Sequence, residues 1–181
     1  DFDTYFKYAD GFEMVTTNGL AGKAMYLSEN HDRQRALDVV RASSSLPFVS
    51  KIVEVDGIPM LDGGIADSIP VQHAIDMGWQ HNVVVLTRNK GWRDMGKDHK
   101  IPYLYKNYPR LRVALSHRHR AYNEQIQLVD DLEAAGKITC IRPIRPLEVG
   151  RIEKDTDKLE RLYEEGFMLG EAFCEKCVEK E

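Results

Sequence analysis

The chain has 181 residues, of which 43% are hydrophobic and 30% charged, and its formal net charge at pH 7 is −4. This apolar content is too high for a disordered chain, and the uncharged apolar runs are far shorter than the ~20 residues that cross a bilayer, which excludes a membrane-spanning protein. The length supports one globular domain or a large part of one, with a hydrophobic core that needs no disulfides.

The first third of the chain predicts two hairpins separated by a helix. Residues 12–17 and 23–28 flank the turn residues Asn18-Gly19 and predict the first hairpin. Residues 33–42 have helical spacing, with Asp32 as the N-cap. Residues 51–55 and 58–61 flank Asp56-Gly57, a strong signal of a two-residue hairpin turn. Pro59 in the last strand indicates that this strand lies at a sheet edge.

A helix is predicted next, with Pro70 as its first residue and Ser68 near its cap. Residues 82–87 are a nearly continuous apolar run, which favours a strand buried on both faces of a parallel sheet. Because strands and helices alternate along the chain, we predict an α/β fold.

The last part of the chain predicts three helices and one short strand. Two helical segments follow the basic loop at 91–100. The first has Leu104, Tyr108, Leu111 and Leu115 on one face, and the second runs over 122–135 to a C-cap at Gly136. Residues 137–141 read as a strand and residues 156–178 as a long amphipathic helix.

The start of the chain and its cysteines bear on its origin. The chain begins with Asp1 rather than Met, without a basic-then-apolar leader, so we expect a processed chain or a piece of a longer protein. Cys140, Cys174 and Cys177 are too few for a disulfide framework, which favours a reducing compartment, the cytoplasm. Cys174 and Cys177 have the two-residue gap of a zinc knuckle or a redox pair, but no second ligand pair lies near them, and we interpret them as two residues on one helix face.

Positive charge is concentrated in residues 88–120, which contain 10 Lys and Arg against 2 Asp and Glu. Such a segment can attract phosphate groups of lipid or nucleic acid. The interpretation that we favour is a solvated helical surface whose basic side chains pair with acidic neighbours. His117 and His119 lie within this segment, and we interpret them as surface residues.

The search for catalytic motifs leaves one candidate. No serine stands in a Gly-x-Ser-x-Gly elbow, and no Walker loop or dinucleotide-binding glycine motif is present. We expect no cofactor and no metal. Asp62-Gly63-Gly64 follows a predicted strand, and its glycines let the backbone turn sharply and leave the Asp62 carboxylate open to a neighbouring site. Strand ends are where open α/β sheets place functional groups.

Other carboxylates and serines near this triplet receive structural interpretations. We interpret Asp67 as a surface or cap residue near the helix at Pro70, and Asp56 as a hairpin turn residue. The run Ser43-Ser44-Ser45 is interpreted as stabilising a helix end or a loop near the mouth of the site.

Four segments together resemble the second half of a patatin-like phospholipase of the bacterial type. They are Ala42-Ser43-Ser44-Ser45-Leu46-Pro47-Phe48, the hairpin around Asp56-Gly57, Asp62-Gly63-Gly64-Ile65-Ala66-Asp67-Ser68-Ile69-Pro70, and the strand at 83–87. The resemblance covers most of residues 12–145. Its most specific part is the Asp-Gly-Gly with a proline six residues after the last glycine, set behind the Ala-Ser-Ser-x-x-Pro stretch.

This resemblance implies a three-layer α/β/α fold of which the chain is the C-terminal part, with residues 1–150 as a portion of the catalytic domain and residues 151–181 as a C-terminal helix. It also implies a lipid acyl hydrolase with a Ser-Asp dyad, in which the aspartate takes the serine proton directly. Only Asp62 maps onto the dyad, with Gly63 and Gly64 as its supporting turn. The serine elbow and the oxyanion loop would lie upstream of Asp1, so we expect the chain alone to be inactive.

The expected partner is a lipid or another acyl ester, with peripheral contact to an anionic membrane surface. The alternative function is a non-catalytic binding module that uses residues 88–120 to bind anionic lipid or nucleic acid, nucleic acid being the less favoured. The implied loss of upstream strands would expose a sheet edge or an apolar face, through which the chain could self-associate.

Overall fold

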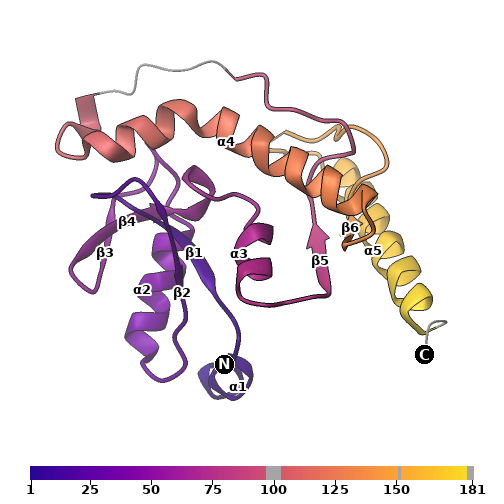
Figure 1. The fold of residues 1–181 in the computed structure, drawn as a ribbon, viewed down its shortest axis with the longest axis horizontal. Helices are drawn as coiled ribbons and strands as arrows, with labels where there is room; N and C mark the ends of the chain where they lie inside the picture. The colour runs from indigo at the N-terminus through magenta and orange to yellow at the C-terminus, as the bar shows by residue number, and fades with distance from the viewer. Residues whose placement is uncertain (97–102, 151, 179–181) are drawn as a thin grey trace. The chain divides into compact units, whose positions relative to one another are not determined.

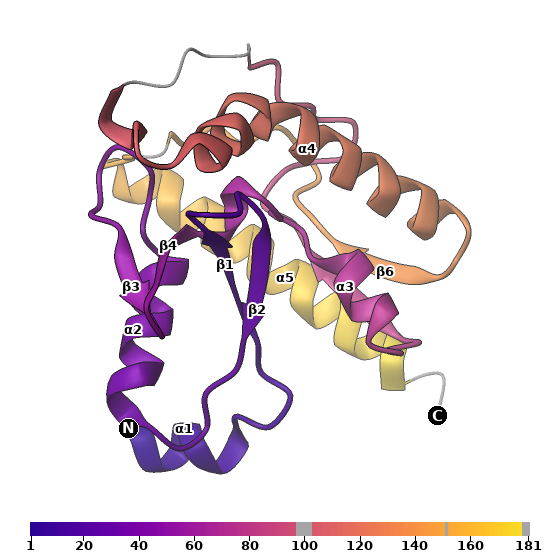
Figure 2. The ribbon, with the colours of Figure 1, turned by 60° about the vertical axis from the view of Figure 1, so that its left-hand side comes forward.

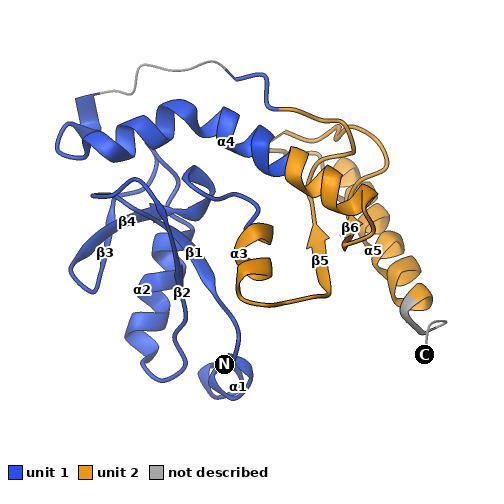
Figure 3. Ribbon diagram, in the orientation of Figure 1, with its two compact units in different colours: residues 1–70, 94–126 blue, residues 71–93, 127–181 orange. Residues whose placement is uncertain are grey.

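A computed structural model describes residues 1–96, 103–150 and 152–178. The chain divides into two compact units (Figure 3), of which unit 1 comprises residues 1–70 and 94–126 and unit 2 comprises residues 71–93 and 127–181. Helix α4 (Pro109–Ala134) contributes its first part to unit 1 and its last part to unit 2.

Unit 1 contains a four-stranded antiparallel sheet with the strand order β2-β1-β4-β3. Its strands are β1 (Met14–Asn18), β2 (Ala24–Leu27), β3 (Val53–Val55) and β4 (Ile58–Asp62) (Figure 1). Both predicted hairpins are confirmed. Asp56 and Gly57 have φ values of 54° and 75°, the pair of positive angles that a two-residue type I′ turn requires.

Helices cover both faces of this sheet (Figure 1). Helix α2 (Arg33–Ser43) packs through Val39 against Met60, and the first part of α4 packs through Leu111 against Leu61. Neighbouring residues of a strand point to opposite faces, so Met60 and Leu61 belong to two separate cores. The α/β class is therefore confirmed, and unit 1 has a helix–sheet–helix layering.

The described part of unit 1 also contains three short helices. Helix α1 (Phe2–Tyr8), which the sequence patterns did not predict, is capped by the Asp1 carboxylate. The 3-10 turns η1 (Gly63–Ile65) and η2 (Tyr103–Tyr105) precede α4. Asp32 caps α2 as predicted, because its carboxylate accepts the N–H groups of the second and third helical residues at 2.8 and 2.9 Å.

Unit 2 contains α3 (Val71–Asp76), β5 (Asn82–Val85), β6 (Ile138–Ile141), α5 (Thr156–Val178) and the last part of α4 (Figure 2). Strands β5 and β6 pair in parallel, as the apolar run at 82–87 indicated. Arg142 joins α4 to the sheet through ion pairs with Asp130 at 2.9 Å and Glu133 at 2.8 Å. Gly136, with φ of 68°, follows α4 where the C-cap was predicted.

Three sequence-based expectations about the strands and helices are wrong, and the first concerns Pro59. Strand β4 is an inner strand of its sheet, not an edge strand. Pro59 lies one residue beyond the last β1–β4 pair, Asn18 with Met60, and its carbonyl accepts the N–H of Gly19 at 2.7 Å. The missing proline N–H is therefore tolerated where the pairing with β1 has already ended.

The other two corrections concern α4 and β5. Residues 109–134 form one helix instead of two, because Pro109 stands in the first turn, where its missing N–H costs nothing, and no helix breaker follows before Gly136. Leu104, expected on the apolar helix face, precedes the helix and is 66% exposed. Strand β5 is not buried on both faces, since Val83 and Val85 are 48% and 71% exposed.

Among residues 1–96, 103–150 and 152–178, no helix combines the length and apolar character needed to cross a bilayer.

Candidate active site at the end of strand β4

Asp62 is the last residue of β4 and the N-cap of η1, both within unit 1. Its Oδ1 accepts the N–H of Gly64 at 2.7 Å, which fixes the orientation of the half-buried carboxylate. Within the described residues, no group donates a hydrogen bond to Oδ2. One oxygen is therefore held by the turn, and the other is available to a hydroxyl group of a substrate or a nucleophile.

The main chain of Asp62 is held by two further hydrogen bonds. Its N–H donates to the carbonyl of Ser45 at 3.0 Å, and its carbonyl accepts the hydroxyl of Thr17, a fully buried residue of β1, at 2.8 Å. The serine run at residues 43–45 thus contacts Asp62 through the backbone carbonyl of Ser45. The carboxylate is positioned by β1, β4 and the end of α2 rather than by the turn alone.

Gly63 is required because the turn packs directly on β1. A Cβ atom on Gly63 would lie 2.3 Å from the carbonyl oxygen of Val15, far inside van der Waals contact. Any side chain here would push the turn away from the sheet and move Asp62 with it. The first glycine of the Asp-Gly-Gly pattern is therefore required because the turn lies very close to the backbone of β1 at this position.

Two residues that the sequence did not identify as site residues, Ser68 and Arg118, lie close to Gly64, two positions after Asp62. A Cβ atom on Gly64 would lie 3.0 Å from Asp62 Oδ1, 3.5 Å from Ser68 Oγ and 3.9 Å from Arg118 Nη2. Ser68 Oγ and Arg118 Nε both donate to the Gly64 carbonyl, at 2.8 and 2.7 Å. The structure thus brings an arginine of the basic segment to the site, and the only signal for it was the excess of positive charge at 88–120.

The remaining candidates occupy the structural positions that we expected. Asp67 accepts the Tyr26 hydroxyl at 2.6 Å and the N–H of Ile69 at 3.2 Å, as a loop-stabilising residue before α3 does. Asp56 is in the β3–β4 turn and forms an ion pair with Arg35 at 2.8 Å. The three serines end α2, where Ser43 Oγ donates to Val15 and Ser45 Oγ donates to Arg41.

A groove of about 470 Å³ lies next to the site within unit 1. Most of its wall is formed by small and apolar residues of the β1–β2 hairpin, of η1 with the residue after it, and of α4, namely Ala21, Gly22, Ala24, Ile65, Ala66, Val113, Ala114 and Ala121. Lys23, Arg110 and His117 also line it, and no carboxylate does. An apolar wall with cations beside it suits an acyl chain attached to a polar or anionic headgroup.

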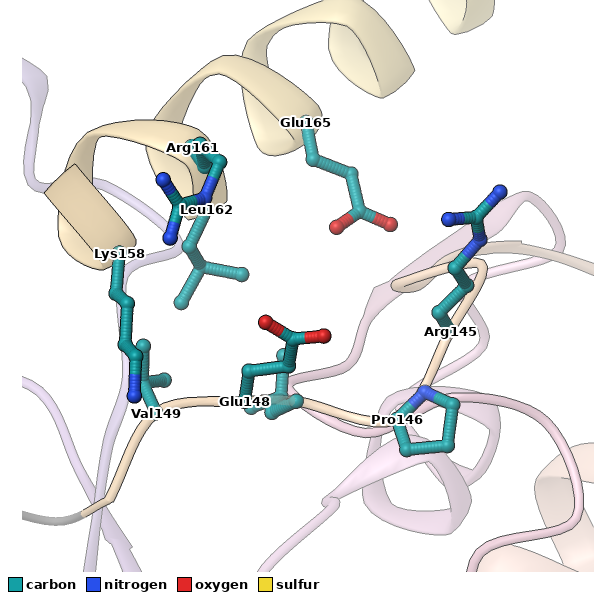
Figure 4. A pocket seen from close by; sticks show the side chains of 9 residues that line it. Arg145, Pro146, Glu148, Val149, Lys158, Arg161, Leu162 and Glu165 are labelled. Carbon is teal, nitrogen blue, oxygen red and sulfur yellow. The ribbon is translucent and has the colours of Figure 1, made fainter.

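A second pocket, of about 200 Å³, lies in unit 2 between residues 145–149 and α5 (Figure 4). The carboxylates of Glu148 and Glu165 point toward its centre, with the guanidinium of Arg161 at its side. Glu165 also accepts the N–H of Ile144 at 2.8 Å. The mixed charge of this small pocket does not resemble an ester site, and it contains none of the predicted site residues.

In the basic segment at residues 88–120, some basic side chains pair with acidic neighbours, as the favoured interpretation expects. Lys90 forms an ion pair with Glu133 at 3.0 Å and Arg93 with Asp130 at 3.0 Å, both within unit 2. Residues 97–102 of this segment lie outside the described residues. His117 is exposed, as expected for a surface residue.

The cysteines show no sign of a metal or redox site in the described part of the chain. Cys140 and Cys174 are free, and burial raises the pKa of the Cys140 thiol. The side chain of Cys177 lies outside the described residues. Over those residues, no group of three His, Cys, Asp or Glu side chains is placed to hold a metal ion.

Comparison with known proteins gives two family matches on different parts of the chain. Residues 8–75 match the model of the patatin-like phospholipase family, which confirms the resemblance for the part that contains Asp62 and its turn. Residues 108–179 match a domain of unknown function, DUF6363, which covers α4, β6 and α5.

A similar protein is the uncharacterized protein YjjU of Escherichia coli (strain K12). It is 29% identical to this chain over 151 residues, which are 78% of this chain and 41% of YjjU. The chain therefore spans less than half of the length of this relative.

Proposed function

We propose that this chain carries the general base of a lipid acyl hydrolase, with Asp62 as the aspartate of a Ser-Asp dyad. The observation that carries the proposal is the geometry of Asp62. This half-buried carboxylate is fixed through Oδ1 at a strand end and has an open Oδ2, inside the segment that matches patatin-like phospholipases. The groove beside η1, with its apolar wall and its cations, supports a lipid ester as the substrate.

In the proposed reaction, Asp62 removes the proton from a serine hydroxyl as the serine oxygen attacks the ester carbonyl. The carboxylic acid then returns this proton to the leaving alcohol, and an acyl-enzyme remains. In the second half, Asp62 takes a proton from water, whose oxygen attacks the acyl-enzyme, and the fatty acid leaves with the serine hydroxyl restored. A positioned base of this kind contributes roughly 10²–10⁴-fold to the rate.

We propose that the nucleophilic serine does not come from residues 1–181. No serine of the chain stands in a glycine-flanked elbow. Ser68 approaches the same place as Asp62, but its hydroxyl donates to the Gly64 carbonyl. The chain matches less than half of YjjU, so a longer polypeptide has room for a serine elbow and for the amide donors of an oxyanion hole. We also propose a cytoplasmic location, on the evidence of the few cysteines.

Turnover of p-nitrophenyl butyrate and labelling by a fluorophosphonate test the proposal. We expect neither with this chain alone, and both with a polypeptide that carries the serine elbow upstream of it. In that polypeptide, Asp62→Asn should lower kcat at least ~10²-fold. Asp67→Asn is the matched control and should retain most of the activity. Turnover by this chain alone that is lost in Ser68→Ala would contradict an upstream nucleophile, and full activity of Asp62→Asn would contradict the dyad.

A further inference from the structure

The turn between α2 and β3 exposes apolar side chains to solvent. Leu46, Phe48 and Val49 are 53%, 50% and 82% exposed. The carbonyl of Leu46 accepts the N–H of Ser50 at 2.9 Å, which closes the turn. Phe48 has a φ of 67°, a conformation that bulky residues rarely adopt. These features show a defined turn that presents its apolar side chains outward.

A second exposed apolar segment lies beside this turn, at the start of η2. Tyr103 and Leu104 are 75% and 66% exposed. The two segments are joined by Tyr105, whose hydroxyl accepts the N–H of Phe48 at 2.9 Å and whose ring centroid lies 5.5 Å from that of Phe48. Both views show them side by side (Figures 1 and 2). We call the five exposed residues, Leu46, Phe48, Val49, Tyr103 and Leu104, the apolar tip.

In the two described segments that form the apolar tip, all charged residues are basic. Residues 44–53 and 103–112 contain no Asp or Glu, while Lys51 and Lys106 are exposed within them. Neither lysine has an ion-pair partner among the described residues, and Lys106 Nζ lies 5.0 Å from the centre of the Tyr103 ring. Apolar side chains surrounded by lysines, with a tyrosine at the boundary, match the composition of surfaces that enter a membrane interface.

We propose that the apolar tip inserts into the interface of an anionic phospholipid bilayer, with Lys51 and Lys106 contacting the headgroup phosphates. Anionic lipid attracts lysines near its surface, and exposed apolar side chains gain by leaving water. A second copy of the chain is a poorer partner for this surface, because its lysines would meet lysines of the same sign. The proposal concerns membrane binding and does not depend on catalysis.

Co-sedimentation with large vesicles tests the proposal on the purified protein. We expect binding to vesicles of equimolar phosphatidylcholine and phosphatidylglycerol, and much weaker binding to phosphatidylcholine alone. Val49→Asp should lower the partition coefficient roughly tenfold, since it removes an inserted side chain and adds a like charge to the anionic surface. The matched control is Ile144→Asp, a similarly exposed residue of unit 2, which should bind as the wild type does.

Two further variants separate this proposal from its alternatives. The double variant Lys51→Glu with Lys106→Glu should lose binding to the mixed vesicles, and Asp62→Asn should bind them fully even if the proposed catalytic role is wrong. Equal binding by the wild type and Val49→Asp, or no vesicle binding at all, would overturn the proposal. So would a change of oligomeric state in Val49→Asp without a change in vesicle binding, which would assign the tip to contacts between copies.

Discussion

The two glycines after Asp62 look equivalent in the sequence and differ in the structure. A Cβ on Gly63 would meet backbone atoms of Val15 at 2.3 and 2.6 Å, whereas a Cβ on Gly64 would meet the end of the Asp62 side chain at 3.0 Å. The backbone of Val15 belongs to an inner strand and cannot move away, whereas the Asp62 carboxylate can rotate. Gly63 is therefore needed for the turn to pack on β1, and Gly64 is needed for the Asp62 carboxylate to keep its position.

This difference predicts opposite outcomes for two alanine substitutions. Gly63→Ala should destabilise the protein by at least ~2 kcal/mol, since an overpacked contact with backbone must be relieved by moving the turn. Gly64→Ala should change the free energy of unfolding by less than ~1 kcal/mol, because the Asp62 side chain can move aside. Urea unfolding followed by circular dichroism measures both. Equal destabilisation by the two substitutions would contradict this assignment of roles.

The turn at the end of β4 could be predicted from the sequence, because three consecutive residues, Asp62, Gly63 and Gly64, encode it. The catalytic role of Asp62 stays a prediction. The sequence could not identify Arg118 or the relation of Ser68 to the turn. The hydrogen bond from Arg118 to the Gly64 carbonyl joins residues 54 positions apart, and no local pattern encodes it. Ser68 was expected near a helix cap, but its hydroxyl donates backward to the Gly64 carbonyl.

At the scale of elements, Arg35 joins three segments of unit 1. From α2, it donates to Glu29 in the β2–α2 connection at 2.8 Å and to Asp56 in the β3–β4 turn at 2.8 Å. The backbone N–H groups of Asp32 and His31, together with Arg35, hold the pKa of Glu29 at about 2. The hydrogen bond from Arg35 also lowers the pKa of Asp56.

This network of ion pairs predicts how the free energy of unfolding depends on pH. Because the pKa of Glu29 in the folded protein lies below the value of 4.5 of the free side chain, its contribution is fully present above pH 4.5 and is lost as the pH falls toward 2. Glu29→Gln keeps an acceptor but does not titrate, so its free energy of unfolding should fall less steeply across that range. Urea unfolding at several pH values measures the slope. The exposed Glu124→Gln is the control and should retain the wild-type slope.

Elements with strong local signals were predicted well from the sequence. The Asp56-Gly57 hairpin and helix α2 with its Asp32 cap follow from short-range chemistry. Helix α4 was divided in error into two helical segments, although the residues between Leu115 and Tyr122 include no Gly or Pro that would break a helix. The exposure of β5 could not be predicted, since an apolar strand does not encode whether other elements cover it.

At the scale of the whole molecule, the patatin-like match and the match to the domain of unknown function cover different parts of the chain. The first contains the β-sheet of unit 1 and the Asp62 turn. The second covers α4, β6 and α5, elements that contain none of the predicted catalytic residues but include Arg118, which reaches the Gly64 carbonyl. The proposed general base and a residue that supports its turn therefore come from segments that match different family models.

Unit 2 exposes an apolar sheet face. The only strand that pairs with β5 among the described residues is β6, which leaves strand edges without a partner. Val83 and Val85 point into solvent from β5, although Val and Ile on a parallel sheet are normally covered. Such a face with open edges favours association with another copy.

We therefore expect concentration-dependent self-association of the chain in sedimentation velocity experiments. Val85→Lys should shift the distribution toward monomer, because a lysine on this face must be desolvated or must meet its counterpart in the other copy. Val113→Lys, a substitution of the same kind at an exposed position of α4, should leave the distribution unchanged. If the protein stays monomeric at all concentrations, or if the two variants behave alike, the exposed face of β5 is not the association surface. In a longer polypeptide whose upstream strands cover β5, the association should disappear.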